Sequence, residues 1–212
     1  AYREGRSILD AIHQIKRWRD DGARFVVEAD VEKCFDSIDR DLLLRFFAQY
    51  VAEPEVVELI RAWSECGVRW NDPKKGAGNL LCDASAGPLR QEVLVPSFPT
   101  SARPAATSHV VFSPLGIPQG NVVSPILANV FLDEFDEALL AERFKLVRYA
   151  DDFVILASTE KRAERALEAA EQALGQIRLR LNSQKTKIAT FEGGFEFLGT
   201  AFLGDLVLPT QE

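Results

Sequence analysis

The sequence lacks methionine, long apolar runs and paired cysteines, and each absence narrows what the chain can be. A natural reading frame begins with methionine, so we expect this 212-residue chain to be a fragment of a longer protein. No apolar run approaches the ~20 residues of a membrane span and no signal peptide is visible, so no membrane partner is expected. The cysteines, Cys34, Cys66 and Cys82, form neither a C-x-x-C pair nor a zinc spacing, so a reducing cytoplasm fits best.

Basic residues are also scarce. The chain has 25 lysines and arginines against 32 aspartates and glutamates, which gives a formal net charge of -7 and a pI of about 5.1. This balance argues against nucleic-acid binding, because phosphate neutralisation needs lysine and arginine. A nucleic-acid-binding protein of this composition would have to cluster its basic residues locally. Two such clusters exist, one over residues 3–19 and one at 74–75.

The residues that are present predict a mixed α+β fold. Hydrophobic residues make up 47% of the chain, enough for the core of one large domain or two small ones. Caps and apolar periodicity predict helices over 8–20, 39–50, 54–63, 121–143 and 159–180. Apolar runs bounded by turns predict strands over 25–31, 144–149, 153–157, 187–191, 195–198 and 203–208. Mostly antiparallel strands with helices on one face make an α+β domain.

The segment 67–114 has weak periodicity and many prolines and glycines. Short strands that flank a mobile loop, centred on 72–108, would explain it. An unstructured insertion would explain its middle part equally well.

Asp151 and Asp152 are adjacent carboxylates in the short connection between two predicted strands. Like charges so close raise each other's pKa, and a tight hairpin cannot separate them far. A divalent cation relieves this repulsion, and hard oxygen ligands suit Mg²⁺. Taken alone, the pair is explained more simply as a polar turn, where Asp is favoured for its turn chemistry.

Asp30 makes a metal site a stronger explanation of Asp151 and Asp152 than a polar turn. It ends an apolar strand that begins at Phe25, and such a strand can lie beside the 144–157 hairpin in an α+β sheet. Three carboxylates would then converge at one end of the sheet. This layout suits two metal ions that hold the attacking and leaving oxygens of a phosphoryl displacement. A helix cap or a strand-end solubilising residue remains the alternative for Asp30 alone.

Six segments resemble, in the family order, the sequence blocks of reverse transcriptases. The segment 149–152, Tyr-Ala-Asp-Asp, looks like their Tyr-x-Asp-Asp signature. The segment 116–129 resembles their Pro-Gln-Gly/Ser-Pro block in the group II intron style. The remaining similar segments are 2–7 from the fingers, 28–39 around the first aspartate, and 181–187 and 195–199 from the later palm. The chain is thus similar to a group II intron-like bacterial reverse transcriptase over nearly its whole length.

The resemblance implies a metal site and a division of the chain. Asp30, Asp151 and Asp152 would be the catalytic carboxylates and bind Mg²⁺, with Mn²⁺ as a substitute, and Val31 would lend its backbone carbonyl. The fold would be a polymerase palm with an antiparallel, ferredoxin-like sheet backed by helices, plus partial fingers and no thumb. The expected division is 1–24 partial fingers, 25–66 palm, 67–115 a fingers-type insertion and 116–212 palm.

The resemblance also implies residues that contact the substrates. Phe35 matches the gate position, where a bulky ring would clash with a ribose 2′-hydroxyl and favour deoxynucleotides. Gln119 would pack against the incoming nucleotide, and Gly120 would let the backbone approach it closely. Lys185 would meet phosphate or order the metal site, and Tyr149 would support the primer end.

The function implied by the resemblance is RNA-directed DNA polymerisation, with an RNA template, a DNA or RNA primer and dNTPs as partners. The basic fingers block and the thumb of the family lie outside this sequence, which would explain its acidity and would leave this piece alone inactive. The alternative is an RNA-binding maturase-type module without polymerisation. Group II intron mobility, CRISPR spacer acquisition from RNA with a fused or partner integrase, and phage defence are the biological settings left open. Palm-like cyclases are a remote alternative.

Overall fold

We describe the fold from a computed structural model of the chain. The structure describes residues 5, 7–64, 68–70, 109–111, 115–118 and 122–210, with the backbone alone for 68–70 and 109–111. The loop predicted over 72–108 lies outside these residues. Within the described ranges, no helix has both the length and the apolar character to cross a bilayer.

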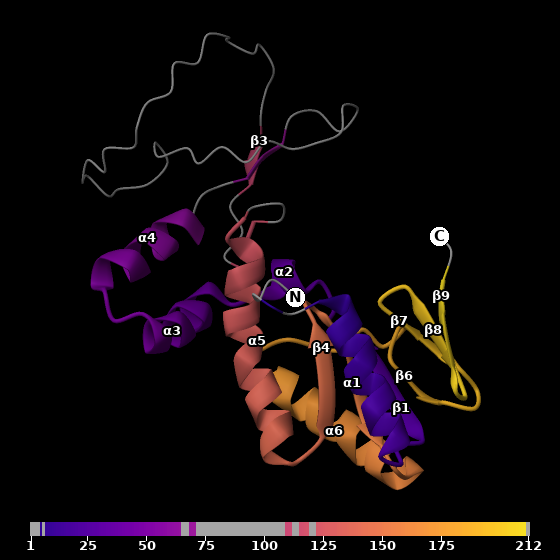
Figure 1. The fold of residues 1–212 in the computed structure, drawn as a ribbon. Helices are drawn as coiled ribbons and strands as arrows, with labels where there is room; N and C mark the ends of the chain where they lie inside the picture. The colour runs from indigo at the N-terminus through magenta and orange to yellow at the C-terminus, as the bar shows by residue number, and fades with distance from the viewer. Residues whose placement is uncertain are drawn as a thin grey trace.

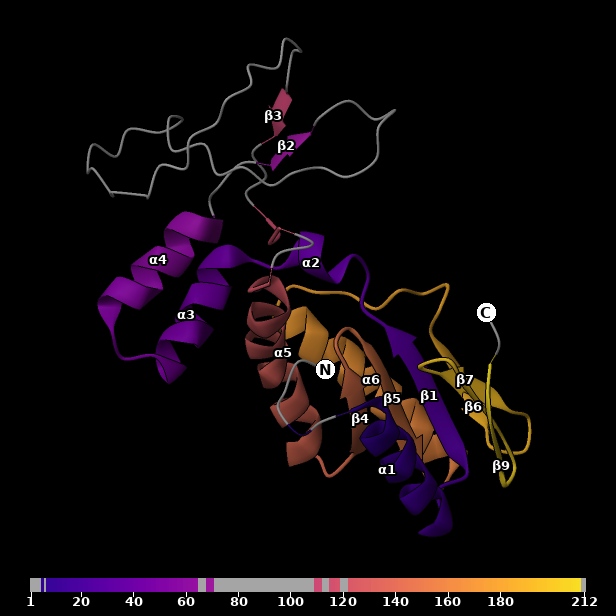
Figure 2. The same ribbon diagram turned by 45° about the horizontal axis from the view of Figure 1, so that its top comes forward.

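The centre of the molecule is a four-stranded antiparallel sheet with the strand order β4-β5-β1-β6. Its strands are β1 (Phe25–Asp30), β4 (Lys145–Tyr149), β5 (Asp152–Ala157) and β6 (Lys187–Thr190). The connection from β1 to β4 ends in a helix that packs on the sheet, and a single helix connects β5 to β6, so the strand order is that of a ferredoxin-like fold, as predicted. Strands that are distant in sequence therefore meet at the centre of the sheet, where β1 lies between β5 and β6 (Figures 1 and 2).

Two helices cover one face of this sheet. They are α5 (Ser124–Ala141) and α6 (Glu160–Gln176), which pack against each other and against the inward side chains of β1 and β5. Figure 2 shows α6 lying behind the sheet. The core between these layers contains the ring pair Phe135 and Phe153, whose centroids lie 4.9 Å apart in an edge-on arrangement. Burial of such rings supplies much of the hydrophobic stabilisation of the domain.

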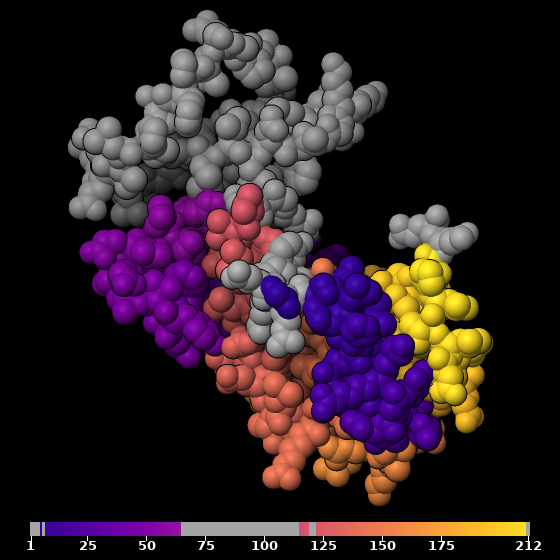
Figure 3. Space-filling model, viewed as in Figure 1, coloured from indigo at the N-terminus to yellow at the C-terminus, as the bar shows by residue number. Residues whose placement is uncertain are grey.

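The opposite face is covered by α1 (Ile8–Asp20) and a small three-stranded sheet. That sheet consists of β7 (Phe195–Phe197), β8 (Thr200–Leu203) and β9 (Leu206–Pro209). The prediction of helices on one face only is therefore incomplete, because Ile15 of α1 packs into a second core on the other face. The space-filling view shows α1 in indigo lying between α5 and the small sheet (Figure 3).

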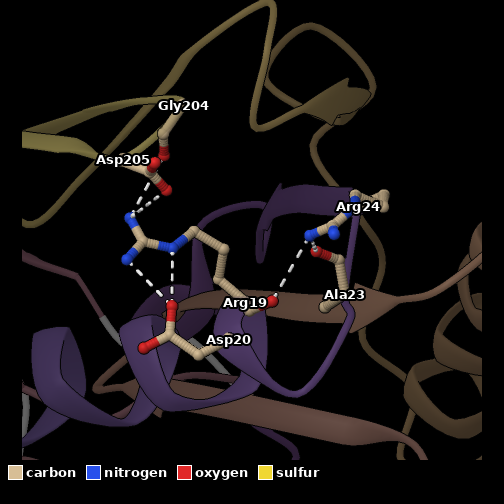
Figure 4. A network of polar contacts seen from close by, with 6 residues as sticks. All are labelled: Arg19, Asp20, Ala23, Arg24, Gly204 and Asp205. Carbon is tan, nitrogen blue, oxygen red and sulfur yellow. Dashed lines mark hydrogen bonds and ion pairs between the residues drawn. The ribbon is translucent and has the colours of Figure 1, made fainter.

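Arg19 links α1 to the small sheet (Figure 4). Its Nη1 donates to the Gly204 carbonyl at 3.1 Å and lies 3.8 Å from the exposed Asp205 carboxylate. Its Nε and Nη2 donate to Asp20 Oδ1 at 3.1 and 2.9 Å. The tight turn at Gly204 and Asp205 also divides the single strand predicted over 203–208 into β8 and β9.

Three more helices follow β1, the first near the end of the sheet and the other two on the outer side of α5 (Figure 1). They are α2 (Cys34–Ser37), α3 (Arg40–Tyr50) and α4 (Pro54–Ser64). The last two were predicted, whereas the four-residue α2 was not. Contact between α3 and α5 includes an aromatic pair, Phe46 and Phe131, at 5.6 Å.

Helix ends account for most other differences from the predictions. The helix predicted over 121–143 begins at Ser124 and ends at Ala141, because Arg143 turns into the left-handed region with φ 59°. The helix predicted to reach residue 180 ends at Gln176, since Arg178 has φ 63°. The short strands predicted to flank the loop are present as an antiparallel pair, β2 (Val68–Trp70) and β3 (His109–Val111).

Candidate functional site

The pairing of β1 with β5 places two aspartates directly opposite each other. Asp30 and Asp152 form the last cross-strand pair of this register. Their chain neighbours Ala29 and Phe153 point into the core beneath α5 and α6. Because side chains alternate along a strand, both carboxylates project from the opposite face, at the edge where the predicted site should lie.

Asp151 lies next to this pair, in the turn between β4 and β5, and we call Asp30, Asp151 and Asp152 together the acidic edge. The turn contains only Ala150 and Asp151, and it is closed by the cross-strand pair of Tyr149 with Asp152. Ala150 adopts φ 59°, a left-handed conformation that a residue with a Cβ takes up only at a cost. Tyr149 packs on the face that α1 covers, which is also the face of Asp30.

Asn182 and Lys185 approach Asp30 from the segment before β6. Lys185 Nζ lies 2.9 Å from Asp30 Oδ2, and Asn182 Nδ2 donates to the same oxygen at 3.4 Å. The backbone N–H of Asn182 also donates to the backbone carbonyl of Asp30 at 2.8 Å. The Asn182 carbonyl in turn accepts hydrogen bonds from the amides of Lys185 and Thr186. Asn182 therefore holds the turn that presents the lysine, a role that the sequence analysis missed.

The charges at this edge shift the pKa values of Asp152, Lys185 and Cys34. Burial raises the pKa of Asp152, the neighbouring charges of Asp151 and Asp30 raise it further, and Lys185 opposes them. The hydrogen bond to Asp30 raises the pKa of Lys185. Cys34, which is buried beside this edge, has its pKa raised to about 12 by burial and by the nearby carboxylates. The edge is thus a concentration of negative charge that favours a cation.

The carboxylate oxygens of the acidic edge are the kind of ligand that a hard divalent cation prefers, but they do not surround a metal position on their own. Among the described side chains, no group of three or more His, Cys, Asp or Glu is arranged to hold a metal ion. The cation that Asp30 contacts is the ammonium of Lys185. Mg²⁺ needs only one or two protein carboxylates, because water and substrate phosphates supply the rest of its ligands. The carboxylates of Asp30 and Asp152, which lie opposite each other, are oxygen ligands of this kind, and Asp151 adjoins them.

Val31 follows Asp30 at the end of β1. It forms an isolated bridge with Leu181, in which the Asp30 carbonyl and the Glu32 amide make the hydrogen bonds. That bridge does not use the Val31 carbonyl, which was the predicted backbone ligand.

Phe35 lies on α2, beside the segment that leads into the Pro-Gln-Gly sequence. Its carbonyl accepts a hydrogen bond from the Ile117 amide at 2.8 Å. The Ser124 hydroxyl donates to the Pro118 carbonyl, which fixes the same segment to the start of α5. The structure thus brings Phe35 next to residues 116–118. The predicted nucleotide-binding residues Gln119 and Gly120 lie outside the described residues.

A cavity of about 640 Å³ adjoins the acidic edge, between the main sheet and β7–β8. Its lining includes a second ion pair, in which Lys187 Nζ lies 3.3 Å from Glu28 Oε1. Burial raises the pKa of Glu28, and the charge of Lys187 opposes that shift. The sequence analysis gave these two residues no role, although a glutamate inside an apolar strand was a signal that could have identified the pair.

Arg148 on β4 is a further residue that the sequence analysis missed. Its guanidinium is buried and donates to Asp136, Asn129 and the Ala150 carbonyl. It therefore contacts the turn that carries Asp151.

Comparison with known sequences points to one family. A family model described as "Reverse transcriptase (RNA-dependent DNA polymerase)" matches residues 1–202. Protein YkfC of Escherichia coli (strain K12) is 27% identical over 93% of this chain and 53% of YkfC. Group II intron-encoded protein LtrA of Lactococcus lactis subsp. cremoris is 27% identical over 69% of this chain and 18% of LtrA. The chain thus spans about half the length of the first relative and about a fifth of the second.

Solved structures show the same fold. A telomerase from Candida Tropicalis in complex with a TWJ fragment of telomeric RNA matches with a TM-score of 0.66 at 13% identity, over 96% of this chain and 33% of that chain. An apo telomerase from the same organism, truncated from its C-terminal domain, matches with a TM-score of 0.62 at 16% identity, over 96% of this chain and 40% of that chain. At these identities, the likeness concerns the fold alone.

Proposed function

This chain belongs to the reverse transcriptase (RNA-dependent DNA polymerase) family, and from that premise we propose that it supplies the catalytic palm of an RNA-directed DNA polymerase. The observation that carries the proposal is the cross-strand pair of Asp30 and Asp152, with Asp151 in the adjoining turn. An acidic edge on an antiparallel sheet suits the transfer of a nucleotide to a primer 3′-hydroxyl.

Asp30, Asp151 and Asp152 are proposed to hold Mg²⁺, with Mn²⁺ as a substitute and the Val31 carbonyl as a further ligand. When bound, the metal stabilises the charge that develops on the transferred phosphoryl group. The chain itself orients these carboxylates through the β1–β5 register and the β4–β5 turn. Asn182 keeps the Asp30 carboxylate in place through its side-chain amide.

The substrate contacts follow from the same premise. Phe35 is proposed to select deoxynucleotides, and the hydrogen bond from the Ile117 amide to its carbonyl supports this role because it brings the Phe35 backbone beside the residues that lead to Gln119. Gln119 and Gly120 are proposed to contact the incoming nucleotide. Lys185 is proposed to bind its phosphates.

We propose that residues 25–66 and 116–212 form the palm, with 1–24 and 67–115 belonging to the fingers. Tyr149 is proposed to support the primer end. An RNA template, a DNA or RNA primer and dNTPs are the proposed partners, and the cytoplasm is the proposed location. The intron-encoded relative LtrA favours a group II intron as the biological setting. CRISPR spacer acquisition with an integrase partner and phage defence remain predictions from the sequence, which the coding neighbourhood of the gene would test.

Primer extension on an RNA template, with the full-length protein, dNTPs and Mg²⁺, tests the polymerase proposal. Asp151→Ala is expected to lower the rate by roughly 10³-fold or more, because metal-ion stabilisation contributes several kcal/mol to such a transition state. Asp205→Ala is the matched control, since Asp205 also lies in a hairpin turn but is exposed and remote from the acidic edge. Its rate should remain at the wild-type value.

Two outcomes would count against the proposal. Extension that persists unchanged in Asp151→Ala would show that the acidic edge is not the catalytic site. Full-length protein that binds intron RNA and promotes its folding without extending a primer would favour the RNA-binding, maturase-type alternative.

A further inference from the structure

Arg148 is a buried charge on the side of β4 that faces α5. Its side chain is 5% exposed, and its Nε and Nη2 form a two-pronged ion pair with the Asp136 carboxylate at 2.7 and 2.5 Å. Burying a guanidinium is unfavourable unless its charge and its N–H groups are matched. Asp136 supplies the charge and two of the acceptors, which leaves the remaining N–H groups of Arg148 to act elsewhere.

Those N–H groups reach the turn between β4 and β5, which carries Asp151. Arg148 Nη1 donates to Asn129 Oδ1 at 3.1 Å and to the Ala150 carbonyl at 2.8 Å. The Ala150 carbonyl belongs to the peptide that leads into Asp151. One guanidinium therefore joins the backbone of the turn to two side chains of α5.

We propose that Arg148 is a positioning residue that holds Asp151 at the metal site by fixing the Ala150 peptide to α5. This inference rests on the proposed function, because it assigns the arginine to the same acidic edge. Arg148 does not contact the reacting atoms in this role. It acts through the orientation of the turn.

Two features of the turn explain why it needs such a link. Ala150 is left-handed, which is a conformation that a turn residue other than glycine readily leaves. The adjacent carboxylates of Asp151 and Asp152 also repel each other, which favours their moving apart. A hydrogen bond to the Ala150 carbonyl opposes both tendencies.

The α5 end of the link is rigid. Asn129 and Asp136 are seven residues apart, which is about two helical turns, so both side chains lie on one face of α5. Asn129 is 9% exposed, and the fork of Arg148 binds both residues in one plane. Arginine fits this arrangement and lysine does not, because the ammonium lacks the planar fork that makes several directed hydrogen bonds at once.

Arg162 offers a matched control at the opposite end of β4. Its Nη2 donates at 2.9 Å to the carbonyl of Arg143, which is also left-handed, with φ 59°. Both arginines therefore bind the carbonyl of a left-handed residue next to β4, but Arg162 lies at the end remote from the carboxylates. Substitution of either arginine by lysine loses a similar hydrogen bond.

The test measures Mn²⁺ affinity of the full-length protein by electron paramagnetic resonance, alongside urea denaturation. Arg148→Lys is expected to weaken Mn²⁺ binding roughly 10- to 100-fold, the range found for residues that orient metal ligands. Arg162→Lys is expected to remain within about twofold of wild type, although both variants lose some stability. A merely structural role for Arg148 would lower stability and leave Mn²⁺ affinity unchanged, and that result would overturn the inference.

Two further variants keep the test decisive. Asp151→Ala separates this inference from the proposed function: if it does not weaken Mn²⁺ binding, the metal site itself is wrong. Asp136→Asn is used if Arg148→Lys fails to fold, because it keeps the arginine and removes the charged partner of its guanidinium. Weaker Mn²⁺ binding in that variant supports the inference, and binding equal to wild type overturns it.

Discussion

Gly116 lies where two distant segments of the proposed nucleotide site approach each other closely. It has φ 89°, and a Cβ added there would lie 2.8 Å from the Asp36 carbonyl oxygen and 2.9 Å from the Asp36 Cα. Its amide donates to the Ile38 carbonyl at 2.8 Å. Both neighbours are backbone, so they cannot rotate away. We expect Gly116→Ala to destabilise the fold.

The magnitude follows from two separate contributions. A residue with a Cβ in the left-handed region costs about 1–2 kcal/mol. Forcing extra volume into a packed site costs about 1–3 kcal/mol more. Gly116→Ala should therefore lower the free energy of unfolding by roughly 2–5 kcal/mol. Gly22→Ala should lower it by the first contribution alone, since Gly22 has φ 91° and no heavy atom within 4 Å of the added Cβ.

Urea denaturation followed by circular dichroism measures both variants, and the difference between them isolates the close approach to Asp36. If Gly116→Ala and Gly22→Ala agree to within about 0.5 kcal/mol, the reasoning is refuted. In primer extension, Gly116→Ala should also raise the KM for dNTPs, because the displaced segment carries the Ile117 amide that binds the Phe35 carbonyl. Gly22→Ala should leave that KM unchanged.

Three further predictions concern single side chains. The hydrogen bond from the Leu42 amide lowers the pKa of Asp39, and Arg178 lowers it further. The ionised Asp39 carboxylate therefore stabilises the folded protein fully above its ordinary pKa of 3.8, and this stabilisation is lost as the pH falls through the lower pKa of the folded state. Asp39→Ala should therefore cost about 1 kcal/mol in urea denaturation at pH 7 and progressively less in acid below that value. Cys34, with the other two cysteines replaced by serine, should react with iodoacetamide only as fast as the protein unfolds, because burial raises its pKa to about 12; rapid labelling of folded protein would contradict this. Lys185→Met should tighten Mn²⁺ binding measured calorimetrically and weaken dNTP binding, because it removes an ammonium that occupies a metal ligand, whereas Lys187→Met should leave Mn²⁺ affinity unchanged.

The main elements could be predicted from the sequence because their signals are local. Ser7 and Thr159 begin α1 and α6 with side-chain caps, as their positions before apolar helical patterns indicated. The α2 helix had no such signal. It begins after Lys33, which is left-handed with φ 46°, and it is held by hydrogen bonds from residues 116–117, far along the chain. No local pattern contains that information.

The same distinction applies to the site. Asp30, Asp151 and Asp152 were predicted from their positions at the ends of apolar runs and from the resemblance of the flanking segments to a known family, and the sheet register places Asp30 opposite Asp152. The partners Asn182 and Arg148 could not be predicted from spacing, because their roles depend on the position of β6 beside β1 and of α5 behind β4. Their neighbours in sequence give no hint of those contacts.

The looped segment before β6 explains how Lys185 reaches the acidic edge. If the regular β1–β6 pairing continued beyond the pair of Glu28 with Lys187, Lys185 would face Asp30 as the next residue on the same face. Leu181 pairs with Val31 instead, so three residues are looped out. The loop still places the lysine ammonium on Asp30, because Asn182 ties it to the Asp30 carbonyl and accepts a hydrogen bond from the Lys185 amide.

The charge of this edge also bears on the acidity of the whole chain. Counting the groups on the edge and its adjoining ion pairs, four carboxylates and two ammoniums give -4 and +2, a formal charge of -2. These groups are Glu28, Asp30, Asp151, Asp152, Lys185 and Lys187. Under the proposed function, one divalent cation would neutralise that charge, and a triphosphate would bring negative charge that calls for a second. The acidity of the chain is therefore compatible with the proposed nucleic-acid substrate, because metal ions would perform at this edge the neutralisation that lysine and arginine perform elsewhere.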